Sequence, residues 1–422
     1  MPRVLLIISL IVAGEMVFGL PFHIARYFRP TMLDVFGFTN TQLGDIFAVY
    51  GLTAMLSYFP GGALADRFSA RFLLTTSLFA TAAGGLYMAM IPGAPQMALL
   101  YGYWGFTSIF LFWGALIRAT RDWGGNDSQG MAFGILEGGR GLTAAIVSSL
   151  GVVILAAQMP ENVELAGDEE RRAAFRSVIL LYSAITALAG VAAWVLIPVP
   201  DNPATSRPNP LVGMSRVVRR PIVWAQAAVV VCAYCGYKGA DNYSLYAVQV
   251  LGMNEVEGAR FATWGAYIRP FAAVVAGLIA DRFDAARSIG VAFVILLMTY
   301  APLTWLVPAA ANANLIIASI FVSFFGVFAI RGIYFALLEE NSTPKPVTGA
   351  AVGLMSFIGF TPDFFFGPIT GRILDATPGV GGFQNYFLFL SGIMVAGFMA
   401  IVWLIWLRRQ GVEKLWPLET KT

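Results

Sequence analysis

Charged residues are scarce in this sequence. Asp, Glu, Lys and Arg make up only 12% of its 422 residues and 58% are hydrophobic, whereas a soluble globular domain carries about 25% charged residues. Such a chain cannot cover a water-soluble fold of this size with polar surface, and its 33 Phe, 15 Tyr and 10 Trp exclude a disordered chain. A net charge of +3 is too small to indicate a nucleic-acid partner. The composition therefore predicts an integral membrane protein.

Residues that bind metals or carry redox chemistry are equally scarce. The one histidine is His23, and the two cysteines, Cys232 and Cys235, belong to a single predicted helix. Since a zinc site needs three or four ligands, we expect the cysteines to be small apolar helix residues. The chain also lacks the patterns G-x-x-x-x-G-K-[ST], G-x-S-x-G and H-E-x-x-H. We therefore expect no enzyme activity, no cofactor and no metal.

Long apolar stretches, by contrast, are abundant. A membrane-spanning helix needs about 20 predominantly apolar residues, and twelve such stretches occur. They are residues 5–28, 41–65, 72–92, 96–120, 131–157, 176–198, 222–246, 258–280, 288–308, 313–337, 348–371 and 385–407. The sequence therefore predicts an all-α integral membrane protein with twelve transmembrane helices.

The basic residues are distributed unevenly among the predicted loops. With the N-terminus inside, fifteen of the 27 Lys and Arg residues fall in inner segments, seven at the outer side and five within helices. Cytoplasmic loops collect Lys and Arg, so both termini are predicted to be cytoplasmic. The longest inner loop, 199–220, is rich in Pro and Arg and is predicted to link an N-terminal six-helix half, 1–198, to a C-terminal half, 221–422.

The two predicted halves contain related sequences. Ala65–Phe68, of sequence ADRF, recurs 215 residues later as Ala280–Phe283. The segment Gly62–Arg71 closely resembles the signature of the loop between the second and third helices of the major facilitator superfamily, G-x-L-A-D-R-x-G-R-[KR]. Ser69 replaces the usual glycine, and Ala70 replaces the first of the two trailing basic residues. The resemblance implies two pseudo-symmetric six-helix bundles that transport a solute by alternating access.

The charged residues of these two loops are candidate switch residues. A carboxylate there can face the positive N-terminus of a neighbouring helix, and an arginine can pair across the loop. Contacts of this kind can form in one conformation and break in another. We expect a role in conformational switching for Asp66, Arg67, Arg71, Asp281 and Arg282.

Five basic residues lie inside the predicted spans, where a charge is costly and marks a functional candidate. They are Arg118, Arg140, Lys238, Arg269 and Arg331. We expect them to bind an anionic solute, with Arg269 as the strongest candidate and Lys238 next. Arg118 and Arg331 occupy matching positions in the two halves. They either clamp a carboxylate, sulfonate or phosphate, or snorkel to the interface and stabilise the inner gate.

Four acidic residues inside the spans are candidates for proton coupling or gating. They are Glu15, Glu137, Asp241 and Asp363. Glu137 and Asp241 each lie three residues from a basic residue on the same helix, so local neutralisation is expected. Glu15 either carries a proton or forms a structural ion pair with another helix. His23, near the outer end of the first helix, is expected to be an interfacial residue.

Together these features predict a secondary active transporter of a small polar solute, most simply an organic anion, coupled to protons. Anion exchange without protons and efflux of a drug or metabolite are the alternatives. The expected partners are the small-molecule solute, a proton and the lipid bilayer. The chain is expected to act as a monomer in a bacterial inner membrane.

Overall fold

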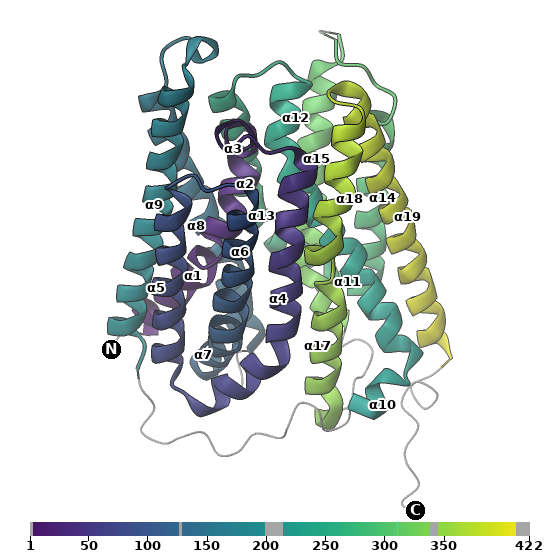
Figure 1. Ribbon diagram of the computed structural model, residues 1–422. Coiled ribbons are helices and arrows are strands. Elements are labelled where there is room, and N and C mark those ends of the chain that lie inside the picture. The colour runs from purple at the N-terminus through teal and green to yellow at the C-terminus, as the bar shows by residue number, and fades with distance from the viewer. Residues whose placement is uncertain (1–2, 126–128, 199–213, 310, 338–344, 411–422) are drawn as a thin grey trace, which may run out of the picture. The chain divides into compact units, whose positions relative to one another are not determined.

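The computed structural model describes residues 3–125, 129–198, 214–309, 311–337 and 345–410, and every regular element in these ranges is a helix (Figure 1). The elements up to residue 196 are α1 (Arg3–Met16), η1 (Gly19–His23), α2 (Ile24–Tyr27), α3 (Arg29–Phe36), α4 (Asn40–Arg67), α5 (Ala70–Met88), α6 (Ala94–Gly105), η2 (Phe106–Trp113), α7 (Gly114–Gly124), α8 (Gln129–Gln158), η3 (Val163–Leu165) and α9 (Asp168–Leu196). Those that follow are α10 (Met214–Val218), α11 (Pro221–Gly239), η4 (Ala240–Asn242), α12 (Tyr243–Gln249), α13 (Glu255–Phe283), α14 (Ala285–Leu303), α15 (Ala313–Ile333), η5 (Tyr334–Ala336), α17 (Lys345–Gly359), α18 (Pro362–Ala376) and α19 (Val380–Arg409).

The helices agree with a multi-pass membrane protein. Among the described residues, eight helices are long and apolar enough to cross a membrane, or ten if each of two bent pairs is one span. Each of the twelve predicted apolar stretches lies mainly in helix; the third falls in α5 and the eleventh in α17 and α18. The predicted all-helical membrane fold is thus confirmed, and the count of twelve is consistent with the structure.

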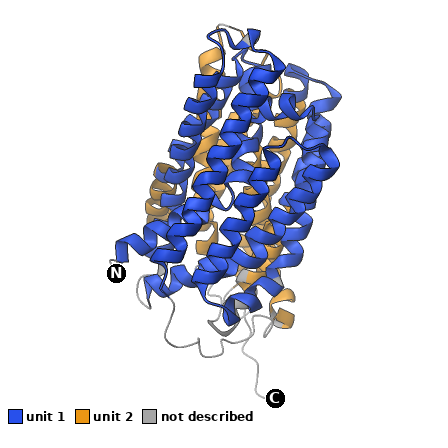
Figure 2. Cartoon of the chain, turned by 60° about the vertical axis from the view of Figure 1, so that its left-hand side comes forward, with its two compact units in different colours: residues 1–205, 240–270, 363–383 blue, residues 206–239, 271–362, 384–422 orange. Residues whose placement is uncertain are grey.

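The chain forms two compact units (Figure 2). Unit 1 consists of residues 1–205, 240–270 and 363–383, and unit 2 of residues 206–239, 271–362 and 384–422. These units group residues by contact, whereas the predicted halves, 1–198 and 221–422, group them by sequence repeat. The halves therefore stay a prediction, and residues 199–213 of the predicted linker lie outside the described part of the chain.

Unit 1 is built on close helix pairs. In it α5 packs along α9, α4 along α6, and α1 against both α8 and α9 (Figure 1). Glycines permit the close approach: a Cβ added at Gly85 of α5 would collide with Ser183 of α9 and Leu20 of η1. Large side chains such as Trp104 and Tyr182 are fully buried.

Unit 2 has a core of its own. Within it α14 packs on α15, and α11 packs on both α15 and α17. Phe293 of α14 and Phe324 of α15 are buried in this core. A Cβ added at Gly326 of α15 would lie 2.8 Å from the side chain of Leu296 of α14, so these helices also need a glycine at their contact.

Two helix interruptions lie where the chain passes from one unit to the other. α11 gives way to η4 at Gly239–Ala240, and Pro362 begins α18 with two residues between it and the end of α17. At a third such point Pro270 lies inside α13, which continues through it. Proline has no backbone N–H to donate to the preceding turn, and helices commonly kink or break there. The break before α18 thus has a local cause in the sequence.

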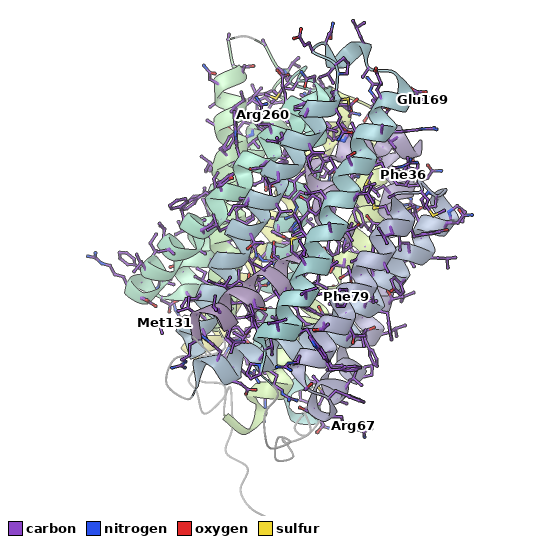
Figure 3. The ribbon with its side chains drawn as sticks, turned by 90° about the vertical axis from the view of Figure 1, so that its left-hand side faces the viewer. Phe36, Arg67, Phe79, Met131, Glu169 and Arg260 are labelled. Atoms are coloured by element: carbon purple, nitrogen blue, oxygen red, sulfur yellow. The ribbon has the colours of Figure 1, made fainter. Side chains whose placement is uncertain are left out.

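Unit 1 has two distinct ends. Arg67, at the end of α4, lies at one end, and Glu169 of α9 and Arg260 of α13 lie at the other (Figure 3). The sequence predicts the Arg67 end to be inner and the Glu169 end to be outer. We refer to them as the predicted inner and outer ends.

Candidate functional site

Four charged side chains from three helices form a closed ring in unit 1. Glu15 of α1 accepts hydrogen bonds from Arg140 Nε of α8 and Arg269 Nη1 of α13, both at 2.9 Å. Glu137, one turn before Arg140 on α8, bridges the same two arginines: it accepts from Arg269 Nη2 at 3.0 Å and from Arg140 Nη1. Each acid therefore contacts both arginines. We call these residues the four-charge ring.

The members of the four-charge ring differ in exposure. The side chain of Glu15 is 2% exposed, that of Arg140 3% and that of Arg269 7%, but that of Glu137 is 36% exposed. The Arg140 guanidinium also lies 5.7 Å from the ring centroid of Phe18, a cation–π distance. Buried charges are tolerated only when paired, and two carboxylates against two guanidiniums leave the ring neutral.

Glycines of α8 make room for this ring. A Cβ at Gly141 would lie 2.9 Å from Cγ and Cδ of Arg269, and one at Gly139 would collide with Ile11 of α1. These two positions let α13 and α1 approach α8. A Cβ at Gly134 or Gly138 would meet nothing within 4 Å, so open space lies beside α8 near Glu137.

His23 is joined to the ring, and the expectation of an interfacial residue is wrong. The residue is 2% exposed, and its Nε2 lies 3.2 Å from Oε1 of Glu15. In a straight helix eight residues span about 12 Å, too far for this contact. The π-helical turn η1, in which His23 N–H donates to the carbonyl of Phe18 five residues back, and a bend of 43° after α1 bring them together.

A second buried ion pair occurs in unit 1. Arg26 Nε of α2 lies 2.5 Å from Oδ1 of Asp241 in η4, and both side chains are 6% exposed. The two residues are 215 positions apart, which is the offset of the sequence repeat. The sequence predicts local neutralisation of Asp241 by Lys238, and within unit 1 the structure gives Asp241 a further partner on α2.

The arginines at matching repeat positions have different surroundings. In unit 1, Arg118 of α7 donates to the carbonyl of Ala65 and lies 3.5 Å from that of Phe68, at the end of α4. This contact lies within the first predicted half, and both interpretations of Arg118, clamp and inner gate, stay predictions. In unit 2, the guanidinium carbon of Arg331 lies 4.1 Å from the ring centroid of Tyr237. Lys238, also in unit 2, is 3% exposed.

The remaining predicted residues belong to the two repeated loops or to α18. Asp66, Arg67, Asp281 and Arg282 are exposed, while Arg71 donates to the carbonyl of Ile197 at 2.5 Å and so ties the start of α5 to the end of α9. Asp363 is 9% exposed in the first turn of α18. A Cβ at Gly51 would overlap the backbone of Asp363, so this turn lies directly against α4.

Sequence analysis missed a set of contacts at the predicted outer end of unit 1. Asp375 of α18 accepts hydrogen bonds from the backbone N–H of Asn40 at 3.1 Å and of Thr41 at 2.7 Å, and so caps the first turn of α4. Glu255, at the start of α13, accepts from Thr31 at 2.9 Å and pairs with Arg171 at 3.2 Å. We call these the outer-end contacts. Their partners are 84 to 335 residues apart, and no local spacing reveals them.

Comparisons with known proteins identify the family to which this fold belongs. The model of the Major Facilitator Superfamily matches residues 11–366. Inner membrane protein YqcE of Escherichia coli (strain K12) is 25% identical over 395 residues, 91% of this chain and 90% of that protein. The probable nitrate/nitrite antiporter NarK1 of Thermus thermophilus is 27% identical over 270 residues, 62% of this chain and 58% of that protein.

A solved structure shares the fold. It is a bacterial homologue of the human lysosomal transporter Spinster in an inward-facing and occupied conformation, with a TM-score of 0.71, 15% identity and coverage of 98% of both chains. The match of the family model covers most of the sequence. The chain therefore belongs to the Major Facilitator Superfamily and is a multi-pass membrane transport protein.

Proposed function

We propose that this protein is a secondary active transporter that moves a small organic anion by alternating access and binds its anionic group between Arg140 and Arg269. The observation that carries the proposal is the position of Glu137. Its two carboxylate oxygens bridge the two arginines, although more than a third of its side chain is exposed. A solute carboxylate, sulfonate or phosphate presents the same kind of oxygen pair.

Arginine suits this task because its planar guanidinium forms parallel hydrogen bonds to such groups. Both arginines are 7% exposed or less, so water competes little for their N–H groups and the attraction for an anion is stronger than at a surface. The open space beside Gly134 and Gly138 adjoins Glu137. It would hold the uncharged part of the solute.

The name of one relative supports the choice of an anion. NarK1 is described as a probable antiporter of nitrate and nitrite, which are both anions. Within unit 2, Lys238 and Arg331 stay candidate anion-binding residues. Asp363 and the loop residues Asp66, Arg67, Arg71, Asp281 and Arg282 stay candidates for gating and switching.

The proposal is tested by ligand-induced stabilisation of the purified protein. Nitrate, L-lactate, gluconate, taurine, inorganic phosphate and the lipophilic cation tetraphenylphosphonium are compared by their effect on the thermal unfolding midpoint. We expect at least one anion, and not the cation, to stabilise the wild type, because binding to the folded state alone raises its stability. Stabilisation by tetraphenylphosphonium alone would refute the anion proposal and favour efflux of a hydrophobic cation.

The paired variant Arg269→Gln/Glu137→Gln locates the site. It removes one positive and one negative charge, so it avoids the several kcal/mol that a buried unpaired charge costs. We expect it to fold but to bind the stabilising anion at least about tenfold more weakly, equivalent to about 1.4 kcal/mol. Arg260→Ala, an exposed arginine on the same helix, is the control and should bind normally. Unchanged anion binding by the paired variant would remove Arg269 from the site.

A further inference from the structure

We propose that His23 takes up the coupling proton while Glu15 remains ionised throughout the transport cycle. The inference rests on the proposed anion transport. It adds the site of the coupling proton to that proposal: His23 lies on the π-helical turn η1 and contacts the four-charge ring, but it is not one of the ring's four members.

Glu15 is poorly placed to accept a proton. One of its oxygens is 2.9 Å from Arg140 Nε, and the other is 2.9 Å from Arg269 Nη1 and 3.2 Å from His23 Nε2. Protonation of either oxygen would weaken an ion pair and leave a buried guanidinium without full compensation, which is strongly unfavourable. The carboxylate therefore acts as a fixed negative charge.

His23 has the complementary arrangement. Its Nε2 faces Glu15, and its buried Nδ1 has no hydrogen-bond partner among the residues that the structure describes. A neutral imidazole has one N–H donor and one acceptor nitrogen. With Nε2–H donating to Glu15, the lone pair is on Nδ1. Proton uptake then forms one N–H bond at Nδ1 and breaks no ion pair.

The surroundings of His23 contain several other polar groups. The ring of Tyr27 lies 5.6 Å from that of His23, and the ring of Tyr182 of α9 lies 6.4 Å away. The hydroxyl of Tyr182 is buried and, within the described part of the chain, also lacks a hydrogen-bond partner. The charged groups that act on His23 are Glu15, Arg26 and Arg269, and Arg140 shares the Glu15 carboxylate. Glu15, in direct contact, favours the imidazolium, whereas Arg26 and Arg269 oppose it.

The charge count links the proton to the solute. The four-charge ring is neutral when His23 is neutral, and proton uptake gives the group a charge of +1. Binding of a monoanion then restores neutrality. A positive charge on His23 strengthens anion binding, and a bound anion strengthens proton binding by the same factor. The proposed arrangement therefore implies symport of one proton with one monovalent anion.

The single histidine permits a direct test. In the untagged protein labelled with 15N in the histidine ring, only His23 contributes an imidazole signal. We expect this signal to change between pH 8.5 and pH 5 from one protonated ring nitrogen to two. We also expect saturating nitrate or L-lactate, whichever stabilises the protein, to move the midpoint to higher pH by about one unit, the equivalent of about tenfold coupling.

A variant separates the proton site from a structural role. His23→Gln keeps an N–H donor for Glu15 but does not titrate, so its anion affinity should not change between pH 5 and pH 8. Tyr27→Phe, which keeps the aromatic contact, should retain the wild-type pH dependence.

Two results would overturn the inference in distinguishable ways. A His23 ring that stays neutral down to pH 5, in a protein whose anion binding still depends on pH, would refute His23 as the proton site and leave anion transport standing. A His23 ring that titrates, in a protein that binds none of the anions, would refute the proposed function and the coupling with it.

Discussion

Under the proposed anion binding, Glu137 is the member of the four-charge ring that an incoming anion replaces. Its side chain is 36% exposed, against 2% for Glu15. When an external carboxylate takes its place, Glu137 can turn toward the open space beside α8, and each arginine keeps a partner. Displacement of Glu15 would instead leave a buried charge unpaired. The two acids of the ring thus have different roles although they contact the same arginines.

We predict that Glu137→Gln binds anions more tightly than the wild type. The substitution removes the competing carboxylate and leaves two arginines against one acid. We expect a dissociation constant for the stabilising anion about tenfold lower, which corresponds to about 1.4 kcal/mol, measured by isothermal titration calorimetry. Asp122→Asn is the control, because Asp122 is 53% exposed and lies 4.0 Å from Arg118 at the predicted inner end. Weaker binding by Glu137→Gln would contradict the exchange between Glu137 and solute.

The residues of the ring could be predicted from the sequence, but their arrangement could not. Glu15, Glu137, Arg140 and Arg269 stand out as charges within apolar stretches. Only the pair on α8 has a local spacing that implies contact, since Glu15 lies 125 residues from Arg140 and 254 from Arg269. As a lone polar residue near the outer end of the first helix, His23 is expected at the interface, and the sequence does not reveal the π-helical turn η1 that brings it to Glu15.

Helix caps explain a departure from the family motif. Ser69 stands where the motif has glycine, and its side chain accepts from Phe72 N–H at the start of α5. Its counterpart in the repeat, Asp284, caps α14 by accepting from Arg287 N–H and pairs with Arg408 at 3.0 Å. Burial raises the pKa of the Asp284 carboxyl, but the hydrogen bonds from Arg287 and Arg408 lower it more. The carboxylate therefore stays ionised at neutral pH.

At the other end of α4, a distant element adds to the local capping box of Thr39 and Gln42. Asp375 satisfies the N–H groups of Asn40 and Thr41, and a Cβ at Gly44 of α4 would overlap the backbone of Gly367 of α18. Because α4 and α18 belong to different predicted halves, these contacts must break if the halves separate at the predicted outer end. We therefore interpret the cap as part of the outer gate.

We predict that Asp375→Ala loosens the predicted outer end. Loss of an N-cap costs about 0.5–2 kcal/mol, so amide hydrogen exchange in the first turn of α4 should accelerate about 2- to 30-fold, as measured by mass spectrometry. Asp45→Ala is the matched control. Asp45 pairs with Arg372 of the same helix α18 at 2.8 Å, but both side chains are at least 50% exposed, and such pairs contribute little. Equal acceleration in both variants would contradict a specific role for the cap.

At the scale of the molecule, the sequence indicates orientation as well as fold. The twelve apolar stretches and the excess of Lys and Arg in one set of loops both come from composition. The division into units could not be predicted, because its boundaries fall at Gly239–Ala240, after Pro270 inside α13 and after Pro362 at the start of α18, and not at the predicted linker alone. A proline inside an apolar stretch either kinks or breaks a helix, and packing decides which.

We predict from the distribution of Lys and Arg that the C-terminus faces the cytoplasm. A green fluorescent protein fused after the C-terminus should fluoresce, and alkaline phosphatase fused at the same point should be inactive, since the first folds on the cytoplasmic side and the second only outside. When the same two proteins are inserted within the loop 160–167, at the predicted outer end, the green fluorescent protein should not fluoresce and the alkaline phosphatase should be active. An active phosphatase at the C-terminus would show that the topology is the reverse of the predicted one.

The spacing of the ring along the chain also has a consequence for biosynthesis. An ionised side chain near the centre of a membrane helix costs about 2.5–3.5 kcal/mol. Glu15 belongs to α1, and Arg269 is made 254 residues later, a delay of roughly 13–50 s at 5–20 residues per second. During that interval the nascent first helix carries an acid that lacks one of its two arginines. Translation and membrane insertion must therefore keep α1 in a polar, protected environment until the eighth span has emerged.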